Sequence, residues 1–212
     1  MLKRPSLLPA LKWLMADSSQ ELMPALSPAF SWRAARTQAR IDLPVLAAQS
    51  YTEEIASLLR RAKYGPQWSS AQKLVRLANK LQAPAWLETP CCLVPVPADP
   101  SRLSQRGFHL PNLLCQALGR QWGVAYDLSR LVKGKSSASL ASLKREQRLL
   151  QLRGLIWCGA QPHPARANAL PYPPVVLIDD VVTTGATASA CIEALQRAGD
   201  RVLGLVVLAR SH

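Results

Sequence analysis

The apolar residues in the second half of the chain fall into short continuous runs, each followed by polar residues or glycine. The runs at residues 91–97, 175–178 and 202–209 do not alternate with polar positions. Such runs are typical of strands buried on both faces of a parallel sheet. Between the last two runs lie a polar loop at 179–187 and a helical pattern at 188–198. This order predicts a βαβ unit with a right-handed crossover, and hence an α/β fold with a central, mostly parallel sheet flanked by helices.

Helical patterns lie on both sides of the first run. Thr52 can cap a helix whose first turn is acidic and whose last turn is basic, and Gly65 is expected to end it. A second apolar stripe predicts a helix that begins at Ser69 or Ser70. A third helix is predicted over residues 111–122, with proline in its first turn. The segment that precedes this third helix is rich in arginine and serine and is predicted to be a loop.

The first 45 residues differ from the rest of the chain. They hold five prolines and show no long hydrophobic period. Residues 1–45 are therefore interpreted as a short irregular N-terminal extension with short helical pieces, of which residues 7–15 are the best candidate. The body of the fold is placed at residues 46–212. A proline-rich stretch at residues 159–174 is interpreted as an exposed connector.

The composition excludes several classes of protein. Hydrophobic residues make up 49% of the chain, which is enough for a large core and argues against disorder. No apolar run is long enough to span a membrane, and the N-terminus lacks a secretory signal pattern, which favours a cytoplasmic protein. The five cysteines are scattered, odd in number and without C-x-x-C spacing. This spacing argues against a disulfide framework, and zinc is not expected.

The charge of the chain is strongly basic. Lysine and arginine outnumber aspartate and glutamate 26 to 13, which gives a net charge of +13. Residues 101–154 alone hold ten basic side chains, opposed by Asp127 and Glu146. A field of one sign destabilises a fold unless an anionic partner binds, so the region predicts a polyphosphate ligand, a nucleic acid or an acidic protein. The alternative is a set of solvated helix faces that only keep the protein soluble.

The loop at residues 179–187 carries the most specific chemistry. It lies beyond the carboxyl end of a predicted strand, where open α/β sheets bind ligands. Asp179 and Asp180 can accept hydrogen bonds from vicinal hydroxyl groups or hold a divalent cation. Five consecutive residues can turn their N–H groups toward an anion at the start of the next helix: Thr183, Thr184, Gly185, Ala186 and Thr187. A phosphate beside a vicinal diol is a ribose 5-phosphate group, and the loop predicts a site for one.

Three segments resemble known families. Residues 175–187, V-V-L-I-D-D-V-V-T-T-G-A-T, resemble the phosphoribosyl pyrophosphate (PRPP) motif of type I phosphoribosyltransferases over all thirteen positions. L-V-P-V-P at 93–97 and R-G-F at 106–108 resemble the proteins of the ComF/GntX family. The resemblance covers about residues 50–212 and implies a type I phosphoribosyltransferase-like fold.

The resemblance also has departures. His109 and Leu110 stand where the family has Asn-Gln after R-G-F. Many family members carry paired C-x-x-C motifs ahead of the body, resembling a zinc ribbon, whereas this chain has no cysteine before Cys91. Residues 1–45 are therefore interpreted as a metal-free element, a candidate remnant of that ribbon.

The resemblance implies a glycosyltransferase of the pentosyltransferase class, active in nucleoside metabolism, that transfers the phosphoribosyl group of PRPP to a base-like acceptor and releases pyrophosphate. Asp179 and Asp180 would hold the ribose hydroxyls, and residues 183–187 the 5-phosphate. Mg²⁺ would bridge the diol and the pyrophosphate, with both aspartates as candidate ligands. Arg102 and Arg106 are candidates for the pyrophosphate, because guanidinium pairs bidentately with phosphate oxygens. Five basic residues are candidates for a lid: Lys133, Lys135, Lys144, Arg145 and Arg148.

Two alternatives from other classes stay open. A non-catalytic protein of this fold could bind nucleotides or single-stranded DNA through residues 101–154, since ComF-type proteins are associated with DNA uptake during competence. A scaffold for a partner such as a competence protein could have kept the fold and lost turnover. His109 is a candidate general base or a structural histidine. Trp68 and Trp86 are candidates for base stacking or for core packing.

Overall fold

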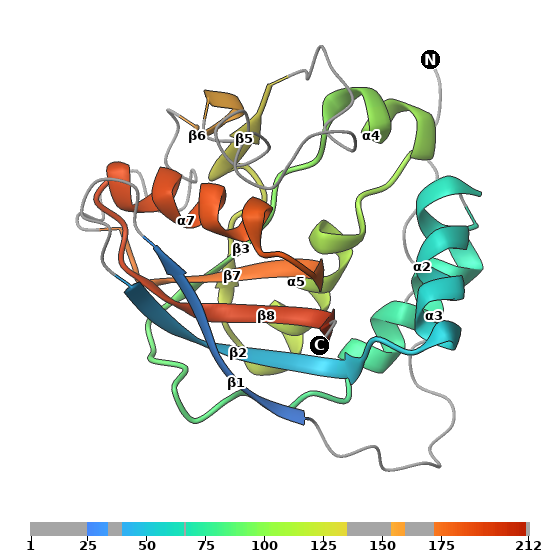
Figure 1. The fold of residues 1–212 in the computed structure, drawn as a ribbon, viewed down its shortest axis with the longest axis horizontal. Coiled ribbons are helices and arrows are strands. Elements are labelled where there is room, and N and C mark those ends of the chain that lie inside the picture. The colour runs from blue at the N-terminus through green and yellow to red at the C-terminus, as the bar shows by residue number, and fades with distance from the viewer. Residues whose placement is uncertain (1–24, 34–39, 66, 135–153, 160–171, 211–212) are drawn as a thin grey trace.

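The computed structural model describes residues 25–33, 40–65, 67–134, 154–159 and 172–210 (Figure 1). Within them, six strands form one sheet in the order β1-β2-β8-β7-β3-β4, and β5 pairs with β6 in a second sheet. The strands are β1 (Ala25–Arg33), β2 (Arg40–Ser50), β3 (Cys92–Pro95), β4 (Ala125–Tyr126), β5 (Leu131–Lys133), β6 (Ile156–Cys158), β7 (Val175–Val182) and β8 (Val202–Arg210). The helices are α2 (Glu53–Tyr64), α3 (Trp68–Ala78), α4 (Pro100–Arg106), α5 (Leu110–Trp122) and α7 (Ala186–Arg197).

The main sheet is parallel except at one edge. The strands β2, β8, β7, β3 and β4 pair in parallel, and β1 lies antiparallel beside β2. Helix α7 connects the neighbouring strands β7 and β8, which confirms the predicted strand–helix–strand unit. The predicted fold class is also confirmed: the protein is α/β, with a mostly parallel central sheet flanked by helices. This architecture is consistent with a phosphoribosyltransferase-like fold.

Each face of the sheet carries its own core. Val175 and Leu177 of β7 pack with α7, β5 and β6, whereas Val176 and Ile178 pack with α2, α3 and α5. Helix α7 lies across one side of the sheet in Figure 1. Because both faces are covered, the apolar runs of the central strands are continuous, and only the strand ends stay open to a ligand. No described helix is long and apolar enough to cross a membrane.

The predicted helix ends agree with the structure to within one or two residues. The Thr52 hydroxyl accepts a hydrogen bond from the Ile55 N–H at 3.3 Å, and Gly65 caps the other end of α2. Helix α3 begins at Trp68, one residue before the predicted start. Helix α5 begins one residue early and ends at Gly123, whose φ of 65° favours glycine.

The structure corrects the interpretation of the N-terminal region. Residues 25–33 and 40–50 form the strands β1 and β2, so the prediction of an irregular extension up to residue 45 is wrong there, and the predicted boundary lies inside β2. The strand was missed because Pro28 breaks the pattern. Proline is tolerated here because β1 is an edge strand whose pairing shifts register between Ser27 and Phe30. The predicted helical piece at 7–15 lies outside the described residues, as does most of the connector predicted at 159–174.

Two corrections concern the strand ends. The predicted arginine- and serine-rich loop forms α4, where the Asp99 carboxylate caps the first turn through the Ser101 N–H at 3.1 Å and Gly107 ends the helix at φ 70°. This helix has no buried residue, so no apolar stripe marked it. Strand β7 continues through both acids to Val182, and α7 begins at Ala186. The predicted loop at 179–187 therefore contains the end of a strand and the start of a helix.

Candidate functional site

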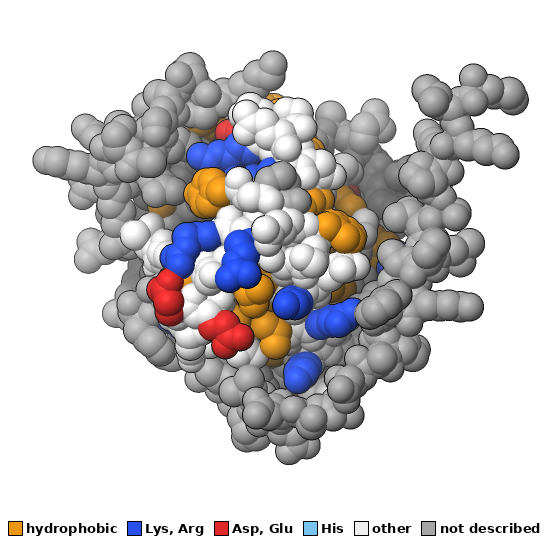
Figure 2. Space-filling view, turned by 90° about the vertical axis from the view of Figure 1, so that its right-hand side faces the viewer, with side chains coloured by type: hydrophobic (Ala, Val, Ile, Leu, Met, Phe, Trp, Pro, Cys, Tyr) orange, Lys and Arg blue, Asp and Glu red, His pale blue; other side chains and the backbone are white. Residues whose placement is uncertain are grey.

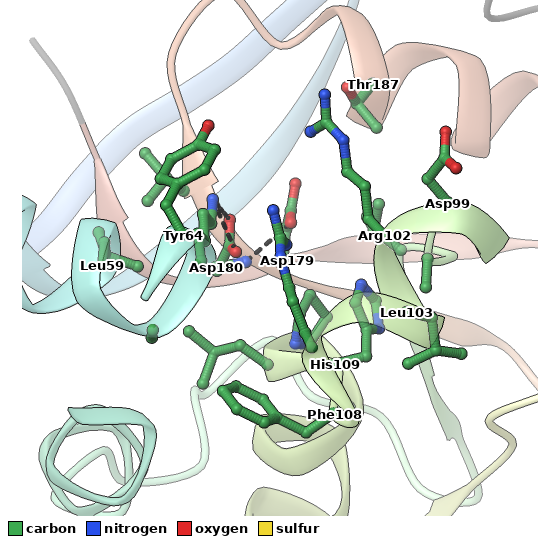
Figure 3. Close-up of a pocket in the computed structure, with 18 of the residues that line it drawn as sticks. Leu59, Tyr64, Asp99, Arg102, Leu103, Phe108, His109, Asp179, Asp180 and Thr187 are labelled. Carbon is green, nitrogen blue, oxygen red and sulfur yellow. Dashed lines mark hydrogen bonds and ion pairs between the residues drawn. The ribbon is translucent and has the colours of Figure 1, made fainter. Parts of the chain in front are cut away.

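A pocket of about 500 Å³ opens where the parallel strands β3 and β7 end (Figure 3). Its walls come from the last turns of α2, the residues after β3, helix α4, the start of α5 and the end of β7. This is the sheet edge at which open α/β folds bind ligands. The strands β7, β8 and β2 point toward this side of the molecule in Figure 1. The topology therefore brings together segments that are far apart in the sequence.

Asp179 and Asp180 lie in the middle of this pocket (Figure 3). They are only 8% and 9% exposed, because both belong to strand β7, which continues from the core past the two acids. The Asp180 N–H donates a hydrogen bond to Asp179 Oδ1 at 2.8 Å. Among the described residues, no other donor reaches the Asp179 carboxylate. The acid pair that the sequence predicted is thus a buried and only partly satisfied pair.

Lys63, in the last turn of α2, reaches the acid pair. Its Nζ lies 2.8 Å from both Oδ1 and Oδ2 of Asp180. The two side chains are 29% and 12% exposed, so the ion pair is partly shielded from water. Lys63 is not among the site residues predicted from the sequence. Its only signal there was a basic charge at a helix end, which the helix dipole already explains.

The three charged groups at the centre of the pocket shift one another's proton affinity. Burial raises the pKa of Asp179 to about 8, and the negative charge of Asp180 adds to this effect while Lys63 opposes it. Burial acts to lower the pKa of Lys63, but the charge and the hydrogen bond of Asp180 outweigh it, and the pKa is raised. Lys63 and Asp180 thus form a close ion pair beside the buried Asp179 carboxyl.

Arg102 and Arg106 lie one turn apart on α4, and both line the pocket. Figure 3 shows Arg102 extending along the pocket toward Thr187. The guanidinium of Arg106 lies 5.5 Å from the centre of the Tyr64 ring, within range of a cation–π interaction. The structure thus brings both predicted arginines to the acid pair. Their assignment to a pyrophosphate group stays a prediction.

Of the five lid candidates, the structure describes Lys133. This residue ends β5 and lines the pocket, with its Nζ 3.6 Å from Asp99 Oδ2 at the start of α4. The other four lie outside the described residues: Lys135, Lys144, Arg145 and Arg148. A role for Lys133 at an anionic ligand is consistent with its place in the pocket, since a lysine is a point charge that can serve a phosphate.

The predicted phosphate loop lies at the N-terminus of α7. Gly185 precedes the helix at φ 71°, a backbone conformation that glycine adopts without strain. Thr183 and Thr187 line the pocket, whereas Thr184 and the buried Gly185 and Ala186 do not. A helix N-terminus provides N–H donors and a positive dipole end, which suit a phosphate. The arrangement therefore permits the anion binding that the motif predicts.

Aromatic side chains surround the mouth of the pocket. Tyr51, Tyr64 and Phe108 line it, and Trp68 packs edge-on against Phe108 with ring centroids 5.4 Å apart. Tyr64 and Trp68 are 73% and 46% exposed. Figure 2 shows lysine and arginine side chains around apolar ones on this face of the molecule. This combination of flat rings and positive charge suits a planar, anionic ligand.

His109 and Trp86 have different surroundings. His109 lines the pocket, and its Nδ1 lies 3.0 Å from Asn112 Oδ1. Burial lowers the pKa of His109, and the hydrogen bond with Asn112 partly offsets this effect. Trp86 packs against the core, where an added Cβ on Gly204 would lie 2.7 Å from its ring. The core interpretation of Trp86 is therefore the one that the structure supports.

The acid pair does not present the ligand set of a metal site. Within the described ranges, no group of three or more histidine, cysteine, aspartate or glutamate side chains could hold a metal ion. Both oxygens of Asp180 contact Lys63, and Asp179 carries a raised pKa. A carboxylate must be deprotonated and free to coordinate Mg²⁺. With both of its oxygens on Lys63, Asp180 in this arrangement does not fit direct magnesium ligation.

The chain is similar to proteins of the ComF type. It is 28% identical over 166 residues to competence protein F of Haemophilus influenzae, which covers 76% of this chain and 70% of that protein. It is 27% identical over 173 residues to DNA utilization protein YhgH of Salmonella typhimurium, with 79% and 72% covered. The E. coli protein of the same name is 26% identical over 165 residues, with 76% and 69% covered. No family model matches the chain. The resemblance to ComF-type proteins is confirmed.

Proposed function

We propose that the pocket binds the ribose 5-phosphate group of PRPP or of a nucleotide, and that the protein works in DNA utilization, as the names of its relatives indicate for those proteins. The single observation that carries this proposal is the meeting of an acid pair, a glycine-bearing helix N-terminus and two arginines in one pocket. A diol is recognised by carboxylates and a phosphate by N–H groups and guanidinium. Each part of the ligand thus has a matching part of the pocket.

The binding mode follows from the order of these groups along the pocket. The ribose hydroxyls would lie over Asp179 and Asp180, with the 5-phosphate at Thr183 and Thr187. Arg102, which extends toward the α7 N-terminus, would contact a phosphate oxygen. The net positive wall would also raise the rate at which an anionic ligand arrives.

If the ligand is PRPP, the matching reaction is phosphoribosyl transfer. The bond from C1 of the ribose to the pyrophosphate oxygen breaks, and the electron pair leaves with the pyrophosphate. A bond forms from C1 to a nitrogen of the acceptor, which gives its proton to solvent. The ring gains positive charge on the way, and Asp180 would stabilise that charge at short range. Magnesium bound to PRPP would be held by the oxygens of the ligand itself.

A second candidate is a non-catalytic protein that binds nucleotides or single-stranded DNA. Two observations favour it: the exposed rings of Tyr64 and Trp68 lie beside Arg106 on the face of the pocket, and the names of the relatives refer to competence and DNA utilization. Stacking on aromatic rings and contacts to phosphates are the usual basis of such binding. Both candidates use the same pocket, and they differ in whether pyrophosphate is released.

Calorimetric titration of PRPP with Mg²⁺ tests the proposal directly. Wild type is expected to bind at micromolar concentration, and an Asp179→Ala, Asp180→Ala double variant to lose that binding. Glu54→Ala, which removes an exposed acid of α2, is the matched control and should bind like wild type. If wild type binds neither PRPP nor ribose 5-phosphate, the proposed ligand is wrong. A salt-sensitive affinity for single-stranded DNA that PRPP does not change would then favour the second candidate.

A further inference from the structure

The ion pair of Lys63 with Asp180 is a feature of the pocket that the PRPP motif does not contain. Lys63 comes from α2, over a hundred residues before the motif in sequence, and its Nζ contacts both oxygens of Asp180 at 2.8 Å. The ion pair lies on the pocket wall, beside Asp179. The ion pair is therefore next to any ligand that lies over the acids.

A pair of adjacent carboxylates is an obstacle to a phosphorylated ligand. Two negative charges at the base of a pocket repel a third, and the repulsion is strong where the pocket excludes water. Protein sites commonly solve this problem with a divalent cation, which takes carboxylate oxygens as ligands. The acid pair of this chain has a different arrangement, because an ammonium group already contacts both oxygens of one carboxylate.

The surroundings of Lys63 agree with the role of a resident cation. Leu59 and Ala62 of α2 flank it, which keeps the side chain partly out of water. The negative charge of Asp180 is paired with Lys63 at 2.8 Å. With that charge paired, two further basic side chains of the wall stay available to an anion, Arg102 and Arg106.

We propose that Lys63 is the resident counter-ion of the acid pair: it occupies the place that a divalent cation would take, and lets a ribose 5-phosphate group bind over the two acids without metal. The first half of this inference concerns the protein alone. The second half rests on the proposed function. Lys63 acts here as a positioning and charge-balancing residue, and its substitution is expected to turn the acid pair into a cation site.

The first half is tested with Mn²⁺ alone, followed by the loss of the free-ion signal in electron paramagnetic resonance. Wild type is expected to bind no Mn²⁺ below millimolar concentration. Lys63→Met frees the Asp180 carboxylate and should bind at least about tenfold more tightly, whereas Lys63→Arg keeps the positive charge and should bind like wild type. Lys73→Met removes an exposed lysine of α3 and is the matched control. Thermal unfolding verifies that each variant is folded.

Two outcomes would overturn the first half. One is Mn²⁺ binding to wild type in the micromolar range that an Asp180→Asn substitution removes, because the carboxylate would then be open to metal with Lys63 in place. The other is a folded Lys63→Met variant that binds Mn²⁺ no better than wild type. The wild-type measurement decides the question even if Lys63→Met does not fold.

The second half is tested by calorimetry with ribose 5-phosphate in the presence of EDTA or of Mg²⁺. The affinity of wild type should change less than about twofold between the two conditions. Lys63→Met should lose at least about tenfold in EDTA and regain part of it in Mg²⁺, a rescue that a purely structural defect would not show. Wild-type binding that requires Mg²⁺ would overturn the inference while the proposed function stands. No binding in either condition would refute the proposed ligand, and the Mn²⁺ result would still decide the role of Lys63.

Discussion

Charged side chains are buried at both edges of the parallel sheet, the one where the strands begin and the one where they end. The two groups differ in how many hydrogen-bond partners they have. At the N-terminal ends of β7 and β8, Arg130 donates two hydrogen bonds to Asp200, from Nε at 2.9 Å and from Nη2 at 2.8 Å. Its guanidinium also lies 4.5 Å from the ring of Tyr172. At the opposite edge, Asp179 accepts one hydrogen bond, from its own neighbour in the chain. Lys63 is held there by a single ion pair.

Arg130, Asp200 and Tyr172 form a cluster at the N-terminal ends of the strands, called the N-terminal cluster below. It continues as a chain of hydrogen bonds. The Tyr172 hydroxyl donates to Asp127 at 3.0 Å, and Asp127 also accepts from the N–H and the hydroxyl of Ser129 at 2.8 and 2.7 Å. These residues lie just before β5 and β7, so the polar chain ties the two sheets together. A buried polar network whose members are satisfied rigidifies the structure around it.

The comparison separates a structural use of buried charge from a functional one. Where each carboxylate oxygen already has a donor, as at Asp200, less acceptor capacity is left for a ligand. Where a buried carboxylate keeps unused acceptor capacity, as at Asp179, the fold tolerates a cost that a ligand can relieve. Acids are buried at both edges, so burial alone does not tell a structural acid from a functional one. The count of donors around it distinguishes them.

The largest expected effect is the loss of stability when the N-terminal cluster is broken. Asp200→Ala leaves the Arg130 guanidinium buried without its partner, and the free energy of unfolding should fall by about 3 to 5 kcal/mol. Asp179→Ala should not lower it, because that side chain accepts one hydrogen bond and its burial is itself unfavourable. Urea unfolding of both variants measures the difference. Equal losses for Asp200→Ala and Asp179→Ala would contradict the separation of the two edges.

The next largest effect is expected in the pH dependence of the free energy of unfolding, through Asp179. Burial raises the pKa of Asp179 to about 8 in the folded protein, whereas in the unfolded chain an aspartate has a pKa near 4. Folding therefore takes up a proton between these values, and the free energy of unfolding falls by up to about 1.4 kcal/mol per pH unit as the pH rises. Above about pH 8 this contribution is constant.

Asp179→Asn removes the titrating group, so the difference in unfolding free energy between this variant and wild type should grow from pH 5 to pH 8 and then level off. Urea unfolding at several pH values measures it. Glu54→Gln, at an exposed acid of α2, is the control and should follow wild type throughout. A constant difference between Asp179→Asn and wild type would show that Asp179 is ionised in the folded protein at pH 5 already.

Only part of the pocket could be predicted from the sequence. The apolar runs identified β3, β7 and β8, because double burial leaves a continuous pattern, and the acid pair was found because it directly follows such a run. Lys63 could not be found in this way. Its role depends on α2 passing the end of β7, which is a contact between distant segments that no local pattern encodes.

The N-terminal cluster escaped sequence reasoning for the same reason. Asp127 was counted there only as an acid opposing a basic region, and Arg130 only as one of ten basic residues. In the structure Asp127 is buried and Arg130 is half-buried, and Tyr172 contacts both of them. Helix α4 was missed for another reason: it buries nothing, so the available signals were its caps at Asp99 and Gly107 and the proline in its first turn.

A smaller effect is expected from Arg102. Arg102→Ala removes a guanidinium at the rim of the pocket, and the affinity for ribose 5-phosphate should fall about 10- to 100-fold, the range of a hydrogen bond to a charged group. Stability should not change, because Arg102 is exposed. Calorimetry measures the affinity, with Arg120→Ala on α5 as a matched exposed arginine. An unchanged affinity would place the phosphate away from α4.

The smallest effect should come from an ion pair that has good geometry but is exposed to solvent. Arg201 forms two hydrogen bonds of 2.8 Å with Glu88, but the two side chains are 65% and 53% exposed. Water screens such a pair, so Glu88→Ala should change the free energy of unfolding by less than about 1 kcal/mol, measured in urea, and even less in high salt. Arg201 directly follows Asp200, so the two pairs share a backbone and differ in burial. A loss near that of Asp200→Ala would mean that bond geometry, rather than burial, sets the contribution of these pairs.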